Sequence, residues 1–119
     1  MARIPTALDG EIPWDIFFSS AKPEVVMQLD LGNALHGGGE PVPFLERYPG
    51  RARTVHLKDY SKTNDRVLIG EGEVAWQAVF QACERVGGTE YYIVEQESYP
   101  YPPMESVDRC LQNLRRMGK

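Results

Sequence analysis

The chain of 119 residues has only two cysteines and no apolar run long enough to cross a membrane. A membrane helix needs roughly 20 apolar residues in succession, and the stretch Met1–Gly10 lacks the charged start and apolar core of a signal peptide. Cys83 and Cys110 stand among apolar neighbours in helical patterns. We therefore expect two buried thiols in a reducing compartment, no disulfide, and a cytoplasmic protein without a membrane partner.

Positive charge is also scarce. Thirteen Lys and Arg face 17 Asp and Glu, which gives a net charge of −4 and a pI near 5.2. This balance lacks the basic footprint of a nucleic-acid-binding protein. A hydrophobic content of 42% suits a globular protein and argues against a disordered chain. At this length we expect residues 1–119 to be a single domain or part of one.

What is present is an alternation of short apolar runs and helix-like segments. Both faces of a parallel strand are buried, so its sequence is almost continuously apolar. Such runs predict strands at residues 24–29, Arg53–Leu57 and Tyr91–Val94, and the long polar segment Lys58–Val74 is a candidate functional loop. Helices are predicted over Pro13–Phe18, Val42–Tyr48, Ala75–Val86 and from about Met104 to the last turn. The expected fold is α/β, with three parallel strands and four helices.

Three strands make a poor domain. A parallel sheet needs cover on both faces, and its two outer strands would here be open edges. The apolar stripes of the predicted helices also exceed what three strands can bury. The pattern therefore predicts a partial TIM (β/α) barrel, completed by association.

Each predicted strand ends at a side chain that can bind a metal. Asp30 follows the first strand, His56 lies near the end of the second, and Glu95 follows the third. Parallel α/β folds place their active sites at the carboxyl ends of the strands. Oxygen and imidazole ligands suit Mn²⁺, Mg²⁺, Co²⁺ or Zn²⁺, and three ligands leave positions open for a substrate.

Each of these residues also has an ordinary structural interpretation. An aspartate at a strand end is more often the N-cap of a helix, and a single histidine is more often a satisfied core residue. Spacing alone does not decide between the two.

Four short segments add a family resemblance. They are MQLDLGN at Met27–Asn33, VHLKD at Val55–Asp59, IGEGEVAW at Ile69–Trp76 and IVEQE at Ile93–Glu97. In this order they resemble the C-terminal part of the xylose-isomerase-like TIM-barrel superfamily of sugar phosphate isomerases and epimerases. The resemblance runs from about Leu8 to the end of the chain.

The resemblance implies that Asp30, His56 and Glu95 bind one divalent metal, together with a fourth ligand, a glutamate on an earlier strand. It further implies that the metal holds adjacent oxygens of a sugar or sugar phosphate while two carboxylates move a proton next to the carbonyl. Glu95 would be one of the two, and its partner would be the missing glutamate.

The resemblance also suggests two substrate contacts. Asn33 stands where many epimerases carry a second histidine, and Arg66 lies in a loop where the family often has a substrate-binding arginine. A solvated loop arginine is the alternative for Arg66. Asp59 could orient Lys58 or a loop amide, or could be purely structural, and His36 is expected to be exposed.

Two other functions compete with a sugar isomerase or epimerase. One is phosphodiester cleavage of the endonuclease-IV type, which has the same fold. Asn33 and Val67 replace two histidine ligands of that family, and the acidic pI argues against a DNA partner. The other is a catalytically inactive part-barrel that acts through self-association, as a homo-oligomer.

Overall fold

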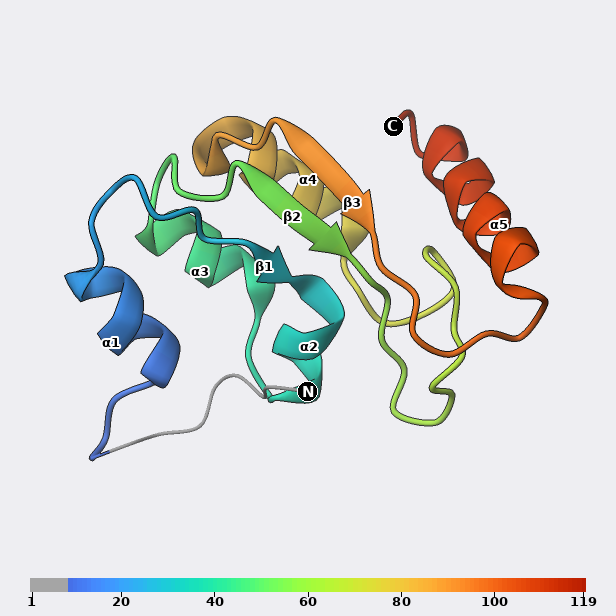
Figure 1. The fold of residues 1–119 in the computed structure, drawn as a ribbon, viewed down its shortest axis with the longest axis horizontal. Coiled ribbons are helices and arrows are strands. Elements are labelled where there is room, and N and C mark those ends of the chain that lie inside the picture. The colour runs from blue at the N-terminus through green and yellow to red at the C-terminus, as the bar shows by residue number, and fades with distance from the viewer. Residues whose placement is uncertain (1–8) are drawn as a thin grey trace.

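The computed structural model describes residues 9–119. The predictions made for the stretch Met1–Gly10 and for the domain of residues 1–119 can therefore be compared with the structure only from Asp9 onward. Within this range the elements follow in the order α1, β1, α2, α3, β2, α4, β3, α5 (Figure 1). The strands are β1 (Leu29–Asp30), β2 (Thr54–Leu57) and β3 (Tyr91–Val94). The helices are α1 (Pro13–Ser20), α2 (Leu31–His36), α3 (Pro41–Arg47), α4 (Trp76–Ala82), which a π-helical turn η1 (Cys83–Gly87) extends, and α5 (Pro103–Arg116).

The three strands form one parallel sheet in the order β1-β2-β3. Asp30 lies beside His56, and His56 lies beside Ile93 on the next strand. The segments between the strands contain the helices α2, α3 and α4, as parallel connections require. The prediction of an α/β partial barrel is confirmed.

Within residues 9–119, helices leave one face of this sheet open and cover the other. Leu29, Val55 and Leu57 are fully buried on that face and join a core that includes Phe44 of α3 and Phe80 of α4. Figure 1 shows α3 and α4 behind the strands, with the other face of the sheet toward the viewer.

The residues that alternate with this core form the uncovered face. Thr54 and His56 are half-buried there, whereas Tyr91 is 64% exposed and Ile93 39% exposed. In a closed barrel this side of the sheet is the packed interior. The open face is therefore the inner wall of a barrel with most of its strands absent from the described residues.

Helix α2 was not predicted from the sequence, so the expectation of four helices was wrong. No helix was expected between the first strand and Val42. Instead, Asp30 Oδ1 accepts the backbone N–H of Asn33 at 2.9 Å and caps the helix. Leu31 and Ala34 are completely buried, and this burial stabilises a helix of only six residues.

The first strand is shorter than predicted. Regular pairing covers Leu29–Asp30 rather than residues 24–29. Val25 and Val26 are each 39% exposed. The buried Met27 donates its N–H to the carbonyl of Arg51 at 2.8 Å, so the chain approaches the sheet there without joining its ladder.

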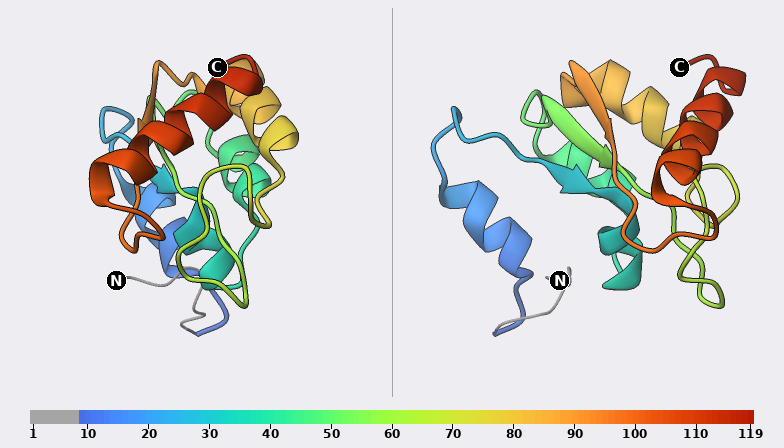
Figure 2. Two further views of the ribbon diagram at one scale, coloured as in Figure 1. Left: turned by 90° about the vertical axis from the view of Figure 1, so that its right-hand side faces the viewer. Right: turned by 45° about the vertical axis from the view of Figure 1, so that its right-hand side comes forward.

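The outer helices carry apolar side chains that nothing in residues 9–119 covers. On α5 the apolar stripe is largely open: Met104 is 81%, Val107 38% and Leu111 39% exposed, whereas Leu114 is buried. On α1, Phe17 is 56% exposed. Figure 2 shows that these two helices lie at opposite ends of the sheet, where further units of a barrel would follow.

Both cysteines are free and fully buried, as expected. Burial raises the pKa of the Cys83 and Cys110 thiols, so neither is a thiolate near neutral pH. They act as small core residues. None of the helices described between residues 9 and 119 has the length and apolar character of a membrane span.

The long loop after β2 is organised by the carboxylate of Asp59, which is 5% exposed. Its two oxygens accept five N–H groups at 2.8 to 3.1 Å, from the backbones of Tyr60, Gly70, Gly72 and Val74 and from the indole of Trp76. A Cβ at Gly72 would lie 2.4 Å from Asp59 Oδ1, so the loop needs glycine to approach this closely.

We predict that Asp59→Ala lowers the free energy of unfolding by about 3 kcal/mol or more. The substitution leaves five N–H groups in this region without their charged acceptor. Urea unfolding measures the change. Asp65→Ala, in the exposed part of the same loop, is the matched control and should change stability by less than about 0.5 kcal/mol. Equal midpoints for the two variants would contradict the role assigned to Asp59.

Candidate functional site

At the junction of β1 and α2, the two carboxylate oxygens of Asp30 have different partners. Oδ1 caps α2, and Oδ2 lies 3.4 Å from Nδ1 of His56. The N-cap interpretation and the site interpretation of this residue are therefore compatible, because each uses a different oxygen.

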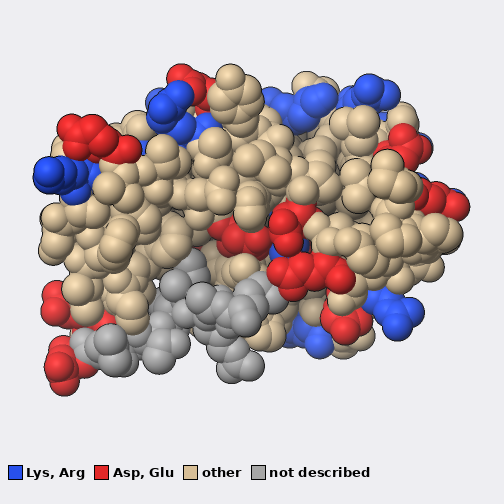
Figure 3. Space-filling model, viewed as in Figure 1, with Lys and Arg blue, Asp and Glu red and all other residues tan. Residues whose placement is uncertain are grey.

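His56 lies between two carboxylates. Its Nδ1 is 3.4 Å from Asp30 Oδ2 and 3.9 Å from Glu95 Oε2. The side chains are 28% exposed for His56, 13% for Asp30 and 31% for Glu95, so the cluster is sheltered but open to small molecules. Figure 3 shows acidic side chains gathered near the middle of the uncovered face, where the strands end. The structure thus brings together Asp30, His56 and Glu95, the three residues predicted at the strand ends.

The spacing of these atoms bears on whether they could hold an ion. At metal–ligand distances of about 2.1 Å, neighbouring donor atoms lie about 3.0 Å apart in an octahedral site and about 3.4 Å apart in a tetrahedral one. The Asp30–His56 distance of 3.4 Å fits, and the His56–Glu95 distance of 3.9 Å is wider. Across residues 9–119 no group of three or more His, Cys, Asp or Glu side chains is arranged as a formed metal site. The chemistry of the three side chains suits a divalent ion, whereas the 3.9 Å between His56 and Glu95 is wider than either geometry requires.

A pocket of about 540 Å³, lined mostly by polar residues, includes the residues that follow His56 and Glu95 in the chain by two positions, and its size suits a small-molecule ligand. Asn33 lines it, as its predicted substrate contact requires. The other lining residues come from the start of α2, the loop after β2 and the segment after β3, and they include Lys58, Asp59, Gln96 and Glu97.

An ion pair joins Lys58 and Glu97 beside this pocket, and it was not predicted from the sequence. Lys58 Nζ lies 3.1 Å from Glu97 Oε1 and donates to Asn33 Oδ1 at 3.4 Å. The signal was present in the spacing, since Lys58 and Glu97 each follow a cluster residue, His56 or Glu95, by two positions. In an extended chain, residues two apart point to the same side.

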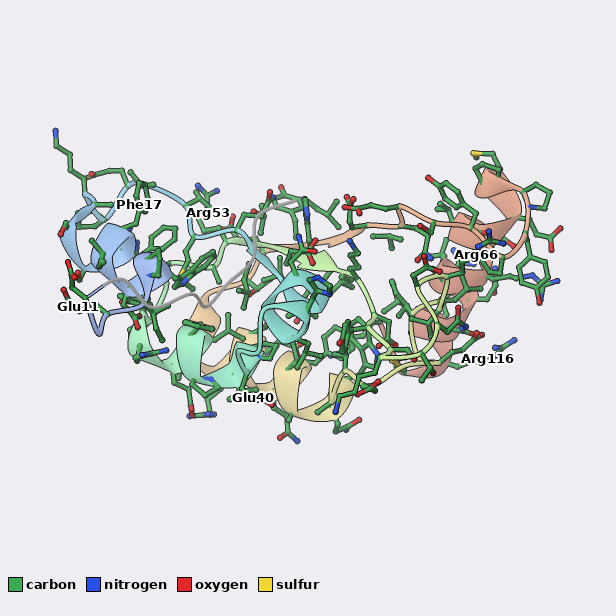
Figure 4. All side chains as sticks on the ribbon, turned by 90° about the horizontal axis from the view of Figure 1, so that it is seen from below. Glu11, Phe17, Glu40, Arg53, Arg66 and Arg116 are labelled. Carbon is green, nitrogen blue, oxygen red and sulfur yellow. The ribbon has the colours of Figure 1, made fainter. Side chains whose placement is uncertain are left out.

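Arg66 lies elsewhere. It is exposed, its backbone N–H donates to Asn64 Oδ1 at 2.9 Å, and it is not among the residues that line the pocket. Figure 4 places it toward the α5 end of the molecule. His36 is exposed as expected, but it borders the pocket and its ring meets that of Tyr60 edge-on, with 6.0 Å between ring centroids.

Comparisons with known proteins identify a family that this chain resembles. Residues 11–117 match the model of the xylose isomerase-like TIM barrel family. No curated protein matches the chain.

Two solved structures from Parabacteroides distasonis ATCC 8503, both described as a sugar phosphate isomerase/epimerase, have a similar fold. One is 24% identical with a TM-score of 0.76, and the other is 27% identical with a TM-score of 0.73. The matches cover 88% and 89% of this chain but only 36% and 38% of those chains. The chain thus spans well under half the length of these structures, and their fold extends well beyond it.

The family match covers nearly the whole chain, and the parallel sheet with metal-capable residues at its strand ends agrees with it. The chain belongs to the xylose isomerase-like TIM barrel family.

Proposed function

We propose that residues 1–119 are the C-terminal part of a metal-dependent sugar isomerase or epimerase, and that Asp30, His56 and Glu95 hold its divalent ion. One observation carries this proposal: two carboxylates lie 3.4 and 3.9 Å from the same imidazole nitrogen, at the carboxyl ends of neighbouring parallel strands. The similarity to structures described as sugar phosphate isomerase/epimerase supports a sugar or sugar phosphate as substrate.

The donor set favours Mn²⁺, Mg²⁺, Co²⁺ or Zn²⁺, because it combines carboxylates and an imidazole with no thiolate. When bound, such an ion holds sugar oxygens and polarises the carbonyl. Asp30 is held in place for this role by the cap that its other oxygen makes to α2. The fourth ligand of the proposed site is a glutamate on an earlier strand.

Glu95 is the proposed base. Its carboxylate removes the proton from the carbon next to the carbonyl and can return it to the same carbon. Inversion at that carbon requires a second acid on the opposite face, which is the role proposed for the glutamate on an earlier strand. Asn33 in the pocket contacts a substrate hydroxyl through its amide. Arg66 remains a prediction from the family loop.

The second candidate is a catalytically inactive part-barrel that acts through self-association. The uncovered inner wall and the open apolar stripe of α5 favour association, since contiguous exposed apolar surface marks an interface. Two free buried cysteines support the proposed cytoplasmic location.

We expect Mn²⁺ binding to depend on the cluster. Asp30→Asn, His56→Gln and Glu95→Gln should each weaken the affinity for Mn²⁺ by tenfold or more, because each removes a proposed direct ligand, and supporting residues alone contribute about 10- to 100-fold. Calorimetry or the electron paramagnetic resonance of free Mn²⁺ measures it. Glu90→Gln is the matched control, because Glu90 precedes β3 and so lies at the opposite end of that strand from Glu95. Unchanged affinity in all three cluster variants would refute the ligand assignment.

A single base is enough to exchange a proton with solvent even when inversion is blocked. In D₂O with Mn²⁺, the chain should catalyse exchange of hydrogen for deuterium at the carbon next to the carbonyl of dihydroxyacetone. Proton NMR measures the rate of this exchange. Glu95→Gln should reduce the rate at least about 100-fold, the lower range for a general base. Exchange that persists in this variant would exclude Glu95 as the base.

The part-barrel should associate. Light scattering after size exclusion is expected to show a mass above 13.5 kDa, and Val107→Lys combined with Leu111→Lys on α5 should shift it toward the monomer, because charges on this open stripe oppose apolar contact. Lysine in place of Arg115 and Arg116 keeps the charge and serves as the control. A monomer at all concentrations would remove the self-association candidate.

A further inference from the structure

Lys58 and Glu97 form a second polar pair, one step beyond the cluster of Asp30, His56 and Glu95. Each lies two residues past a cluster residue, and their charged atoms are 3.1 Å apart. The ammonium also donates to Asn33 Oδ1 at 3.4 Å. The pair thus lies beyond the carboxyl ends of β2 (Thr54–Leu57) and β3 (Tyr91–Val94).

All three side chains line the pocket of about 540 Å³, whereas the cluster residues do not. The Lys58 side chain is only 16% exposed and that of Glu97 is 45% exposed. The pocket is large enough for a hexose and begins next to the cluster at which the reaction is proposed.

The position of Lys58 is fixed by its surroundings. Helix α2 passes so close that a Cβ on Gly32 would lie 2.9 Å from Lys58 Cγ and 2.9 Å from the carbonyl oxygen of Asp59. The next residue is Asp59, whose carboxylate anchors the loop through five hydrogen bonds. An ammonium held in this way is a preorganised donor.

An ammonium has only donors and a carboxylate only acceptors. Neighbouring hydroxyl groups of a sugar can satisfy both, because one oxygen accepts from the ammonium while the other hydroxyl donates to the carboxylate. The separation of the two oxygens in such a diol is similar to the 3.1 Å between Lys58 Nζ and Glu97 Oε1.

We propose that Lys58 and Glu97, with Asn33, form a subsite for a vicinal diol of the substrate, on the part of the sugar that extends from the reacting carbons into the pocket. This inference rests on the proposed function, which places the reacting carbons of the sugar at the cluster and so the rest of the sugar in the pocket. It makes the pair a determinant of chain length: a hexulose reaches the subsite, and a three-carbon ketose occupies the cluster alone. No covalent step is involved.

The test compares two ligands. Binding of D-fructose and of dihydroxyacetone is measured by titration with saturation-transfer NMR, in the presence of Mn²⁺. Lys58→Met and Glu97→Gln should each weaken D-fructose binding about tenfold, the effect of losing one charge-assisted hydrogen bond, and should change dihydroxyacetone binding less than about twofold. Lys22→Met, the same change at an exposed site outside the pocket, should change neither.

The outcomes separate the subsite from the proposed reaction. Equal losses for both ligands, or unchanged D-fructose binding in Lys58→Met, would overturn the subsite, as would a wild-type chain that does not bind D-fructose. Mn²⁺ binding in the same samples reports independently on the cluster. Retained Mn²⁺ affinity and an unchanged circular dichroism spectrum in Lys58→Met show that the variant is folded, so that its loss of D-fructose binding belongs to the pair.

Discussion

The parallel register of the three strands is the constraint on which the candidate site depends. It sets Asp30 beside His56 and lets the chain after β3 bring Glu95 to the same nitrogen. The register is fixed from the opposite face, where Leu29, Val55 and Leu57 are completely buried. A slip of one residue would expose these core side chains and bury the polar ones. The same strand pairing therefore determines both the core packing on one side of the sheet and the candidate site on the other.

The same one-sided packing is what part of a barrel is expected to show. The hydrophobic core lies between the sheet and the helices α3 and α4, while Tyr91 and Ile93 on the inner wall stay exposed. The exposed side chains at the two ends, such as Phe17 on α1 and Met104 on α5, fit neighbours that would follow in a ring of units. The matched structures, of which the chain spans 36% and 38%, have more than enough further chain to supply such units.

Much of this could be predicted from the sequence, because strands that are buried on both faces in a complete parallel barrel have almost continuously apolar sequences, and because polar residues mark the strand ends. Helix α2 could not, since it has only six residues and its stability comes from tertiary burial of Leu31 and Ala34. The sequence predicted apolar stripes on the helices, but it could not show which residues of the α5 stripe are covered by the rest of the chain. The role of Asp59 was left open because its five donors come from residues up to 17 positions away, and such long-range convergence has no local signature.

The shared carboxylate of Asp30 has a consequence for the order of the local chain. A six-residue helix is not stable by itself, and α2 depends on its cap as well as on burial. Any charge that draws Oδ2 toward the cluster also sets the orientation of Oδ1, and with it the first turn of the helix that carries Asn33 to the pocket. An ion bound at the proposed site would therefore be linked, through this one side chain, to the position of Asn33 in the pocket wall.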